Sequence, residues 1–139
     1  MLTGPRFVLD AQPLSLLAED DHRMVALLEI ARQESFAPMI SAVTIAEVRR
    51  TGKTEERLRW LRSRLTVVPV TEKTADLAAA LLEQTGPDGH ECVVDSLVVA
   101  TAAGVMGPVK VVSSDGSHVP KLCAAASTGR TSPVQWVRV

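Results

Sequence analysis

Aromatic residues are scarce in this chain, and several other marks of particular protein classes are missing. There are two Phe, two Trp and no Tyr among 139 residues, so we do not expect a platform of rings that stacks nucleic-acid bases. The longest uncharged run, Ser96 to Val109, is about 14 residues and too short to cross a bilayer. The first residues show no basic region followed by an apolar stretch, so no secretory signal is predicted.

Cysteine is equally sparse. Cys92 and Cys123 match no zinc or redox spacing, and two residues do not make a disulfide framework. Free thiols without a secretory signal predict a cytoplasmic protein that does not contact a membrane. The length, with 46% apolar and 22% charged residues, predicts one globular domain over residues 1–139.

Neither sign of charge dominates, because fifteen basic and sixteen acidic residues give a formal net charge of −1. A passive nucleic-acid-binding protein is usually basic, so this balance argues mildly against that class. The segment from Arg49 to Arg64 is different, with seven basic residues against two acidic ones. Such a surplus could attract phosphate. The alternative is a solvated helix with an ion pair between Glu55 and Arg59.

Short β-type runs alternate with helical patterns along the chain. We predict strands at residues 6–9, 38–40, 65–70, 109–112 and 134–137, and helices at 14–17, 24–31, 43–50, 55–64, 71–82, 92–103 and 119–126. Residues 84–90 read as a loop, and Pro69 predicts an edge position for its strand. This order predicts an α/β fold with a mostly parallel sheet. Ligands of such sheets bind at the carboxyl ends of the strands.

Four carboxylates occupy positions that this edge of the sheet could bring together. Asp10 follows the first strand, Glu47 lies on the helix after the second, Asp95 lies in the apolar helix before the fourth, and Asp115 follows the fourth. Converging carboxylates repel one another unless cations offset them. Oxygen ligands suit Mg²⁺ or Mn²⁺, and these ions suit phosphodiester cleavage by water.

Asp95 is the most informative of the four, because the helix around it is apolar nearly all round. An unpaired charge there would be costly, and such groups are usually paired, neutralised or bound to metal. The structural alternative is that Asp95 caps a helix that begins at Ser96.

The other three acids also have structural alternatives. Asp10 could cap a helix that starts near Pro13, and Asp115 with Gly116 could form a turn. Glu47 could be a solvated residue of an amphipathic helix. Taken singly, each acid is a weak signal; the pattern of all four carries the interpretation.

The segments that hold these acids are FVLDA at residues 7–11, SAVTIAEV at 41–48, VVDSLVVATA at 93–102 and VVSSD at 111–115. In this order and spacing they resemble the PIN domain, specifically the VapC-type toxin ribonucleases of bacterial toxin–antitoxin pairs. The resemblance covers nearly the whole chain. It implies a three-layer α/β/α fold with a five-stranded parallel sheet ordered 3-2-1-4-5.

The resemblance also implies a Mg²⁺- or Mn²⁺-dependent endoribonuclease. Asp10, Glu47, Asp95 and Asp115 would be its catalytic, metal-binding acids, with Glu47 serving a second ion or its water. Because water is the nucleophile, the products would carry a 5′-phosphate and a 3′-hydroxyl. The partners implied are RNA, a small antitoxin protein and a second copy in a homodimer. The antitoxin would bind a hydrophobic groove near leucines that could equally be core residues: Leu14, Leu16, Leu17 and Leu28.

The chain departs from the family pattern after Asp115. Family members often carry further acids there, as in SDPDD, whereas this chain has Gly116, Ser117 and His118. We expect Ser117 to cap the last helix and His118 to be a surface histidine rather than a ligand. The missing acids leave open a catalytically weak or inactive PIN-like protein that binds a partner. A phosphoacceptor receiver domain is disfavoured, because it needs an aspartate after the third strand, and Val70-Thr71-Glu72 stands there.

Overall fold

The computed structural model describes residues 2–48, 53–86 and 89–139; for residues 53, 89 and 90 it describes the backbone alone. Strands and helices alternate through the described residues in the following order: β1 (Arg6–Leu9), α1 (Ala11–Ala18), α2 (His22–Gln33), β2 (Ala37–Ser41), α3 (Ala42–Glu47), α4 (Lys53–Arg64), β3 (Thr66–Val68), α5 (Glu72–Thr85), α6 (Gly89–Ala103), β4 (Val109–Ser113), α7 (Val119–Ala126) and β5 (Val134–Arg138).

The strands form one parallel sheet in the order β3-β2-β1-β4-β5, as the sequence predicted. Val8 of β1 pairs with Met39 of β2 on one side and with Val111 of β4 on the other. All three side chains are fully buried, which is typical of a parallel sheet covered on both faces. The strand that Pro69 follows, β3, lies at one edge of the sheet.

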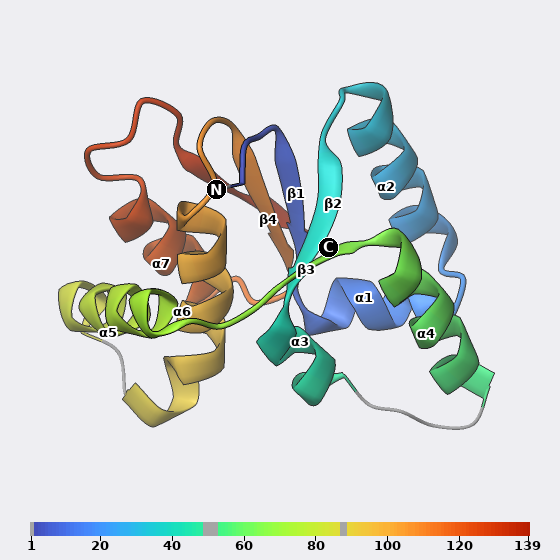
Figure 1. The fold of residues 1–139 in the computed structure, drawn as a ribbon, viewed down its shortest axis with the longest axis horizontal. Helices are drawn as coiled ribbons and strands as arrows, with labels where there is room; N and C mark the ends of the chain where they lie inside the picture. The colour runs from blue at the N-terminus through green and yellow to red at the C-terminus, as the bar shows by residue number, and fades with distance from the viewer. Residues whose placement is uncertain (1, 49–52, 87–88) are drawn as a thin grey trace.

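Helices cover both faces of the sheet (Figure 1). The α5, α6 and α7 helices lie on one face, and α1, α2 and α4 lie on the other. Because side chains alternate along a strand, neighbouring residues of β1 serve different cores. Val8 packs in the core beneath α5 to α7, whereas Phe7 and Leu9 pack in the core beneath α1, α2 and α4. The α/β/α architecture predicted from the sequence is therefore confirmed.

Several element boundaries differ from the prediction. The α3 helix ends at Glu47 rather than at residue 50, and residues 49–52 lie outside the described part of the chain. The strand predicted at 65–70 is shorter, at Thr66–Val68. The predicted loop at 84–90 is also shorter, because α5 continues to Thr85 and α6 begins at Gly89. Gly86 ends α5 in the left-handed conformation, φ 65°, which glycine adopts without strain.

Cys92 and Cys123 are both buried and form no disulfide with each other. Burial raises the pKa of the Cys123 thiol to about 12, so it stays protonated and unreactive at neutral pH. No helix in the described residues is long and apolar enough to cross a membrane.

Candidate metal centre

The carboxyl ends of β1 and β4 lie side by side, and this register brings Asp10 and Asp115 to one place. Leu9 at the end of β1 pairs with Val112 of β4, and the Asp10 backbone N–H donates to the Val112 carbonyl at 3.0 Å. Ser113 connects the two acids: its Oγ donates to Asp10 Oδ2 at 2.9 Å and accepts from the Asp115 backbone N–H at 3.1 Å. Ser113 is fully buried, so this connection is shielded from water.

Asp10 combines two roles that the sequence left as alternatives. It is the N-cap of α1, because its Oδ1 accepts a hydrogen bond from the Ala11 backbone N–H at 2.8 Å. Its side chain is also buried at the strand ends, with the residue 7% exposed. A buried carboxylate with one donor on each oxygen is fixed in orientation, and each oxygen keeps a lone pair for a metal ion.

Asp115 closes a tight turn after β4, as the turn alternative expected. Its Oδ1 accepts from the backbone N–H groups of Ser117 and His118 at 2.8 and 2.9 Å. Burial alone would raise the pKa of Asp115, but these two bonds, with a hydrogen bond from Asp95, outweigh it and lower the pKa. Asp115 therefore holds its charge more easily than Glu47 or Asp95 does.

Asp95 lies inside α6, six residues after the helix begins, so the structural alternative, that it caps a helix starting at Ser96, is excluded. The pKa of its carboxyl is raised from 3.8 to about 7. Burial is the largest cause, followed by the charge of Asp10, a hydrogen bond with Asp115 and the charges of Asp115 and Glu47. Without a cation, a half-buried Asp95 thus holds a proton near neutral pH.

Glu47 is the last residue of α3, and its side chain is largely exposed, as the solvated alternative expected. Partial burial of the carboxyl and the charge of Asp10 nevertheless raise its pKa. It therefore faces the same acids. Glu47 lies at the rim of the group, where a metal ion or its water would meet solvent.

The tightest arrangement of possible metal ligands includes a residue that the sequence reasoning set aside. One ligand atom each of Asp95, Asp115 and His118 lies within 4.8 Å of the others. His118 Nδ1 is 3.4 Å from Asp115 Oδ2 and its side chain is 35% exposed, so the histidine expected at the surface also faces this acid. The available signal was its position, three residues after Asp115, where the resembled family carries an acid.

Ser117 does not cap the last helix. The N-cap of α7 is His118, and its side chain makes no capping hydrogen bond. The turn that begins at Asp115 places Ser117 one residue too early for that role, and its backbone N–H instead donates to the Asp115 carboxylate.

Comparison with known proteins rests on solved structures. No protein-family model matches the sequence, and no curated protein does either. A chain of the VapBC2 complex from Rickettsia felis bound to a promoter DNA fragment superposes with a TM-score of 0.66 at 14% identity, covering 96% of this chain and 98% of that one. The chain has the PIN-like fold.

Two further structures with this fold come from other bacteria. A chain of a toxin–antitoxin complex from Klebsiella pneumoniae has a TM-score of 0.62 at 19% identity, covering 82% of this chain and 92% of that one. A chain of FitAcB from Neisseria gonorrhoeae has a TM-score of 0.60 at 21% identity, covering 95% and 96%. At these identities the similarity establishes the PIN-like fold, and the chemistry must be argued from the residues.

The residues at the strand ends of this PIN-like fold suit a divalent cation. Carboxylate oxygens are the ligands that Mg²⁺ and Mn²⁺ prefer. A cation would also compensate the burial and the mutual repulsion that raise the pKa values of Asp95 and Glu47. Ion-to-ligand bonds of about 2.1 Å place ligand atoms up to about 4.2 Å apart. Binding therefore requires only a small contraction of the group around Asp95, Asp115 and His118.

A substitution at Ser113 tests whether this residue orients the acids of the metal centre. In Ser113→Ala, Asp10 loses a donor and the Asp115 backbone N–H loses its acceptor. Residues that orient metal ligands typically contribute 10- to 100-fold in metal affinity, so we expect Mn²⁺ affinity to fall by about tenfold in calorimetric titration. The exposed neighbour Ser114 provides the control, because Ser114→Ala should leave the affinity unchanged. Equal affinities in the two variants would contradict this role.

Proposed function

We propose that this protein is a Mg²⁺- or Mn²⁺-dependent endoribonuclease and the toxin of a VapBC-type toxin–antitoxin pair, acting as a homodimer. The convergence of Asp10, Glu47, Asp95 and Asp115 at the carboxyl ends of β1 and β4 carries this proposal. The PIN-like fold shared with chains from toxin–antitoxin complexes supports it.

Each of the four acids would have a role that follows from its environment. Asp95 and Asp115 would hold the ion, and Asp10, fixed by Ser113 and Ala11, would complete its shell from the buried side. Glu47, at the rim, would orient the attacking water or hold a second ion. A bound divalent ion supplies a lowered water pKa and neutralises charge on the phosphate. Burial and the charge of Asp10 raise the pKa of Glu47, which makes it a stronger proton acceptor than a fully solvated carboxylate.

A polar hollow beside Glu47 provides room for the RNA strand. It lies between α1 and α4 and has a volume of ≈ 550 Å³, within the usual range of ligand pockets. Its lining includes Gln12, Ser15, Glu47 and Thr54. The α4 helix, which contributes Thr54 and Leu58 to this lining, also carries arginines. Two of them are engaged in ion pairs: Arg57 with Asp20 at 3.1 Å and Arg59 with Glu55 at 3.5 Å. Arg49 and Arg50, the start of the basic segment, lie outside the described residues.

The direct test is cleavage of a labelled RNA with defined ends. We expect cleavage in Mn²⁺ or Mg²⁺, none in EDTA, and products with a 5′-phosphate and a 3′-hydroxyl. A 2′,3′-cyclic phosphate would contradict water as the nucleophile. If RNA stays intact and calorimetry detects no binding at millimolar Mn²⁺, the inactive partner-binding alternative is correct.

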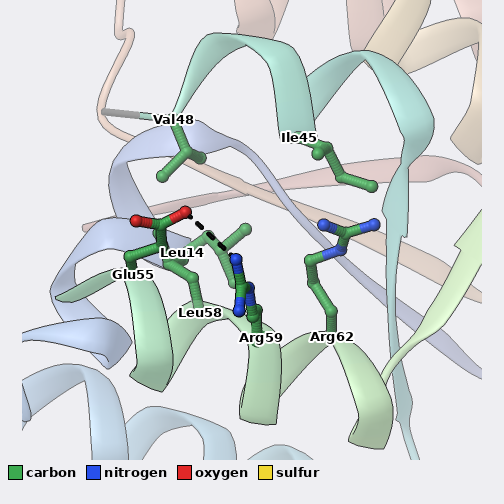
Figure 2. Close-up of a pocket in the computed structure, with 7 residues that line it drawn as sticks. All are labelled: Leu14, Ile45, Val48, Glu55, Leu58, Arg59 and Arg62. Carbon is green, nitrogen blue, oxygen red and sulfur yellow. Dashed lines mark hydrogen bonds and ion pairs between the residues drawn. The ribbon is translucent and has the colours of Figure 1, made fainter. Parts of the chain in front are cut away.

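A groove between α1, α3 and α4, with a cavity volume of ≈ 30 Å³, has room for one side chain of an antitoxin segment. Its lining combines apolar side chains with a charged rim, as Figure 2 shows: Leu14, Ile45, Val48, Leu58, Glu55, Arg59 and Arg62. Arg59 and Glu55, which both lie on α4, form an ion pair at one side of the groove, and Arg62 extends toward Ile45. Leu14 and Leu17, which the sequence offered as groove or core, are 1% and 3% exposed and belong to the core. We propose that an apolar helix of the antitoxin packs here.

Two partly exposed isoleucines allow a matched test of this groove. Ile45→Asp places a charge in the lining, whereas Ile30→Asp places one on the exposed side of α2, where Ile30 is 52% exposed. Loss of one buried aliphatic contact corresponds to about 1.5–3 kcal/mol, so Ile45→Asp should weaken antitoxin binding at least about tenfold. Calorimetry with the protein encoded by the adjacent small reading frame would measure this. Equal weakening by Ile30→Asp would contradict the groove.

A further inference from the structure

We propose that His118 is a ligand of the metal centre and makes it selective for Mn²⁺ and later first-row divalent ions over Mg²⁺. This inference rests on the proposed metal-dependent nuclease function and adds the identity of its ion. The sequence alone left the choice between Mg²⁺ and Mn²⁺ open.

The position of the His118 side chain carries the argument. The turn fixed by Asp115 places His118 at the first residue before α7, where its backbone N–H donates to Asp115 Oδ1. Its imidazole makes no capping hydrogen bond to α7. Instead, the ring lies against the acids, with Nδ1 3.4 Å from Asp115 Oδ2 and a ligand atom within 4.8 Å of Asp95 as well.

An ion pair with Asp115 accounts for only part of this arrangement. At 3.4 Å the Nδ1–Oδ2 contact is longer than a strong charge-assisted hydrogen bond, which is about 2.7–2.9 Å. The Asp115 carboxylate already accepts two backbone hydrogen bonds on its other oxygen. The ring also approaches Asp95, on a separate helix, so it faces the space between the two carboxylates. A cation in that space would contact all three side chains.

The chemistry of imidazole sets the expected selectivity. Oxygen ligands suit both Mg²⁺ and Mn²⁺, whereas imidazole nitrogen suits later first-row ions such as Fe²⁺, Ni²⁺ and Zn²⁺. Mn²⁺ is a softer ion than Mg²⁺ and accepts one imidazole among carboxylates more readily than Mg²⁺ does. A centre that combines Asp95 and Asp115 with His118 is therefore less suited to Mg²⁺ than an all-carboxylate centre of the same geometry. The half-exposed ring, 35% for its side chain, lies where an ion can enter from solvent.

The test measures metal binding rather than cleavage. Mn²⁺ affinity is obtained from the electron paramagnetic resonance signal of the free ion, and Mg²⁺ affinity by competition. We expect His118→Ala to weaken Mn²⁺ binding at least about tenfold, by analogy with losses at supporting residues. His118→Asp should restore a ligand and shift the Mn²⁺-to-Mg²⁺ preference toward Mg²⁺ by about tenfold. Pulsed spectra of bound Mn²⁺ should show nitrogen coupling in the unmodified protein and in the remote control His22→Gln.

The outcomes separate this inference from the nuclease proposal. Loss of nitrogen coupling in both His118 variants, with coupling retained in His22→Gln, supports it. Mn²⁺ bound without nitrogen coupling, or coupling that persists in both variants, overturns the role of His118 and leaves the nuclease proposal standing. No Mn²⁺ binding by the unmodified protein at millimolar concentration overturns both. Circular dichroism would show whether either His118 variant misfolds. Because the two variants differ in size and charge, the variant that folds still tests whether His118 binds the ion.

Discussion

Replacing Asp95 by asparagine is expected to reduce RNA cleavage by at least about 100-fold. The substitution keeps the shape of the side chain and removes one charged ligand from the centre that Asp95 forms with Asp115 and His118. Metal-ion catalysis contributes several kcal/mol to such reactions, and each 1.36 kcal/mol corresponds to a factor of ten in rate. Rates of cleavage of a labelled RNA at saturating Mn²⁺ would measure the loss.

Asp76 supplies a matched control for this experiment. It is exposed on α5, on a helix that does not contribute to the acidic group. Asp76→Asn has the same change in charge and should cleave RNA at the unmodified rate. Cleavage by Asp95→Asn within a few-fold of that rate would remove Asp95 from the mechanism, and with it the metal centre as the source of activity.

The strands and helices and the parallel sheet were predictable because they follow from strong local patterns, whereas the strand order came from the resemblance to the PIN domain. In a sequence, parallel strands that are buried on both faces appear as short, mostly apolar runs, as at Phe7 to Leu9 and Val109 to Val112. Helix starts also carry residue types that favour the N-cap position: Asp21 and Thr71 both accept from the backbone N–H three residues later. The start of α6 was missed, because Gly89 and His90 carry no apolar periodicity that marks a helix.

The sequence predicted which acids lie close together, but it did not predict the contacts that orient them. Strand ends and helix positions placed Asp10, Asp95 and Asp115 correctly at one edge of the sheet. The link through Ser113 was not accessible, since Ser113 is separated from Asp10 by 103 residues and its hydroxyl had no pattern to mark it. The role of His118 depends on the direction of one side chain after a turn, which composition and spacing do not specify. That direction is set by the bonds from residues 117 and 118 to Asp115.

The same Asp95→Asn variant is expected to stabilise the metal-free fold above neutral pH. The folded-state pKa of Asp95, about 7, lies above its ordinary value of 3.8. Between these values the folded chain binds a proton that the unfolded chain has released, so stability falls as pH rises through this window. A shift of about three units corresponds to about 4 kcal/mol. Solvent screening of a half-buried group reduces this to roughly 2 kcal/mol.

Chemical denaturation in EDTA at pH 5 and pH 8 would reveal this difference. At pH 8, Asp95→Asn should be more stable than the unmodified protein by roughly 2 kcal/mol, and at pH 5 the advantage should be smaller. Added Mn²⁺ should reverse the order at pH 8, because an ion that binds the folded state stabilises it and the variant has lost a ligand. An unmodified protein that is as stable as the variant at pH 8 without metal would show that these carboxylates do not strain the fold. The repulsion that makes the acids costly in the empty centre is what a bound cation relieves, so activity and metal-free stability should change in opposite directions.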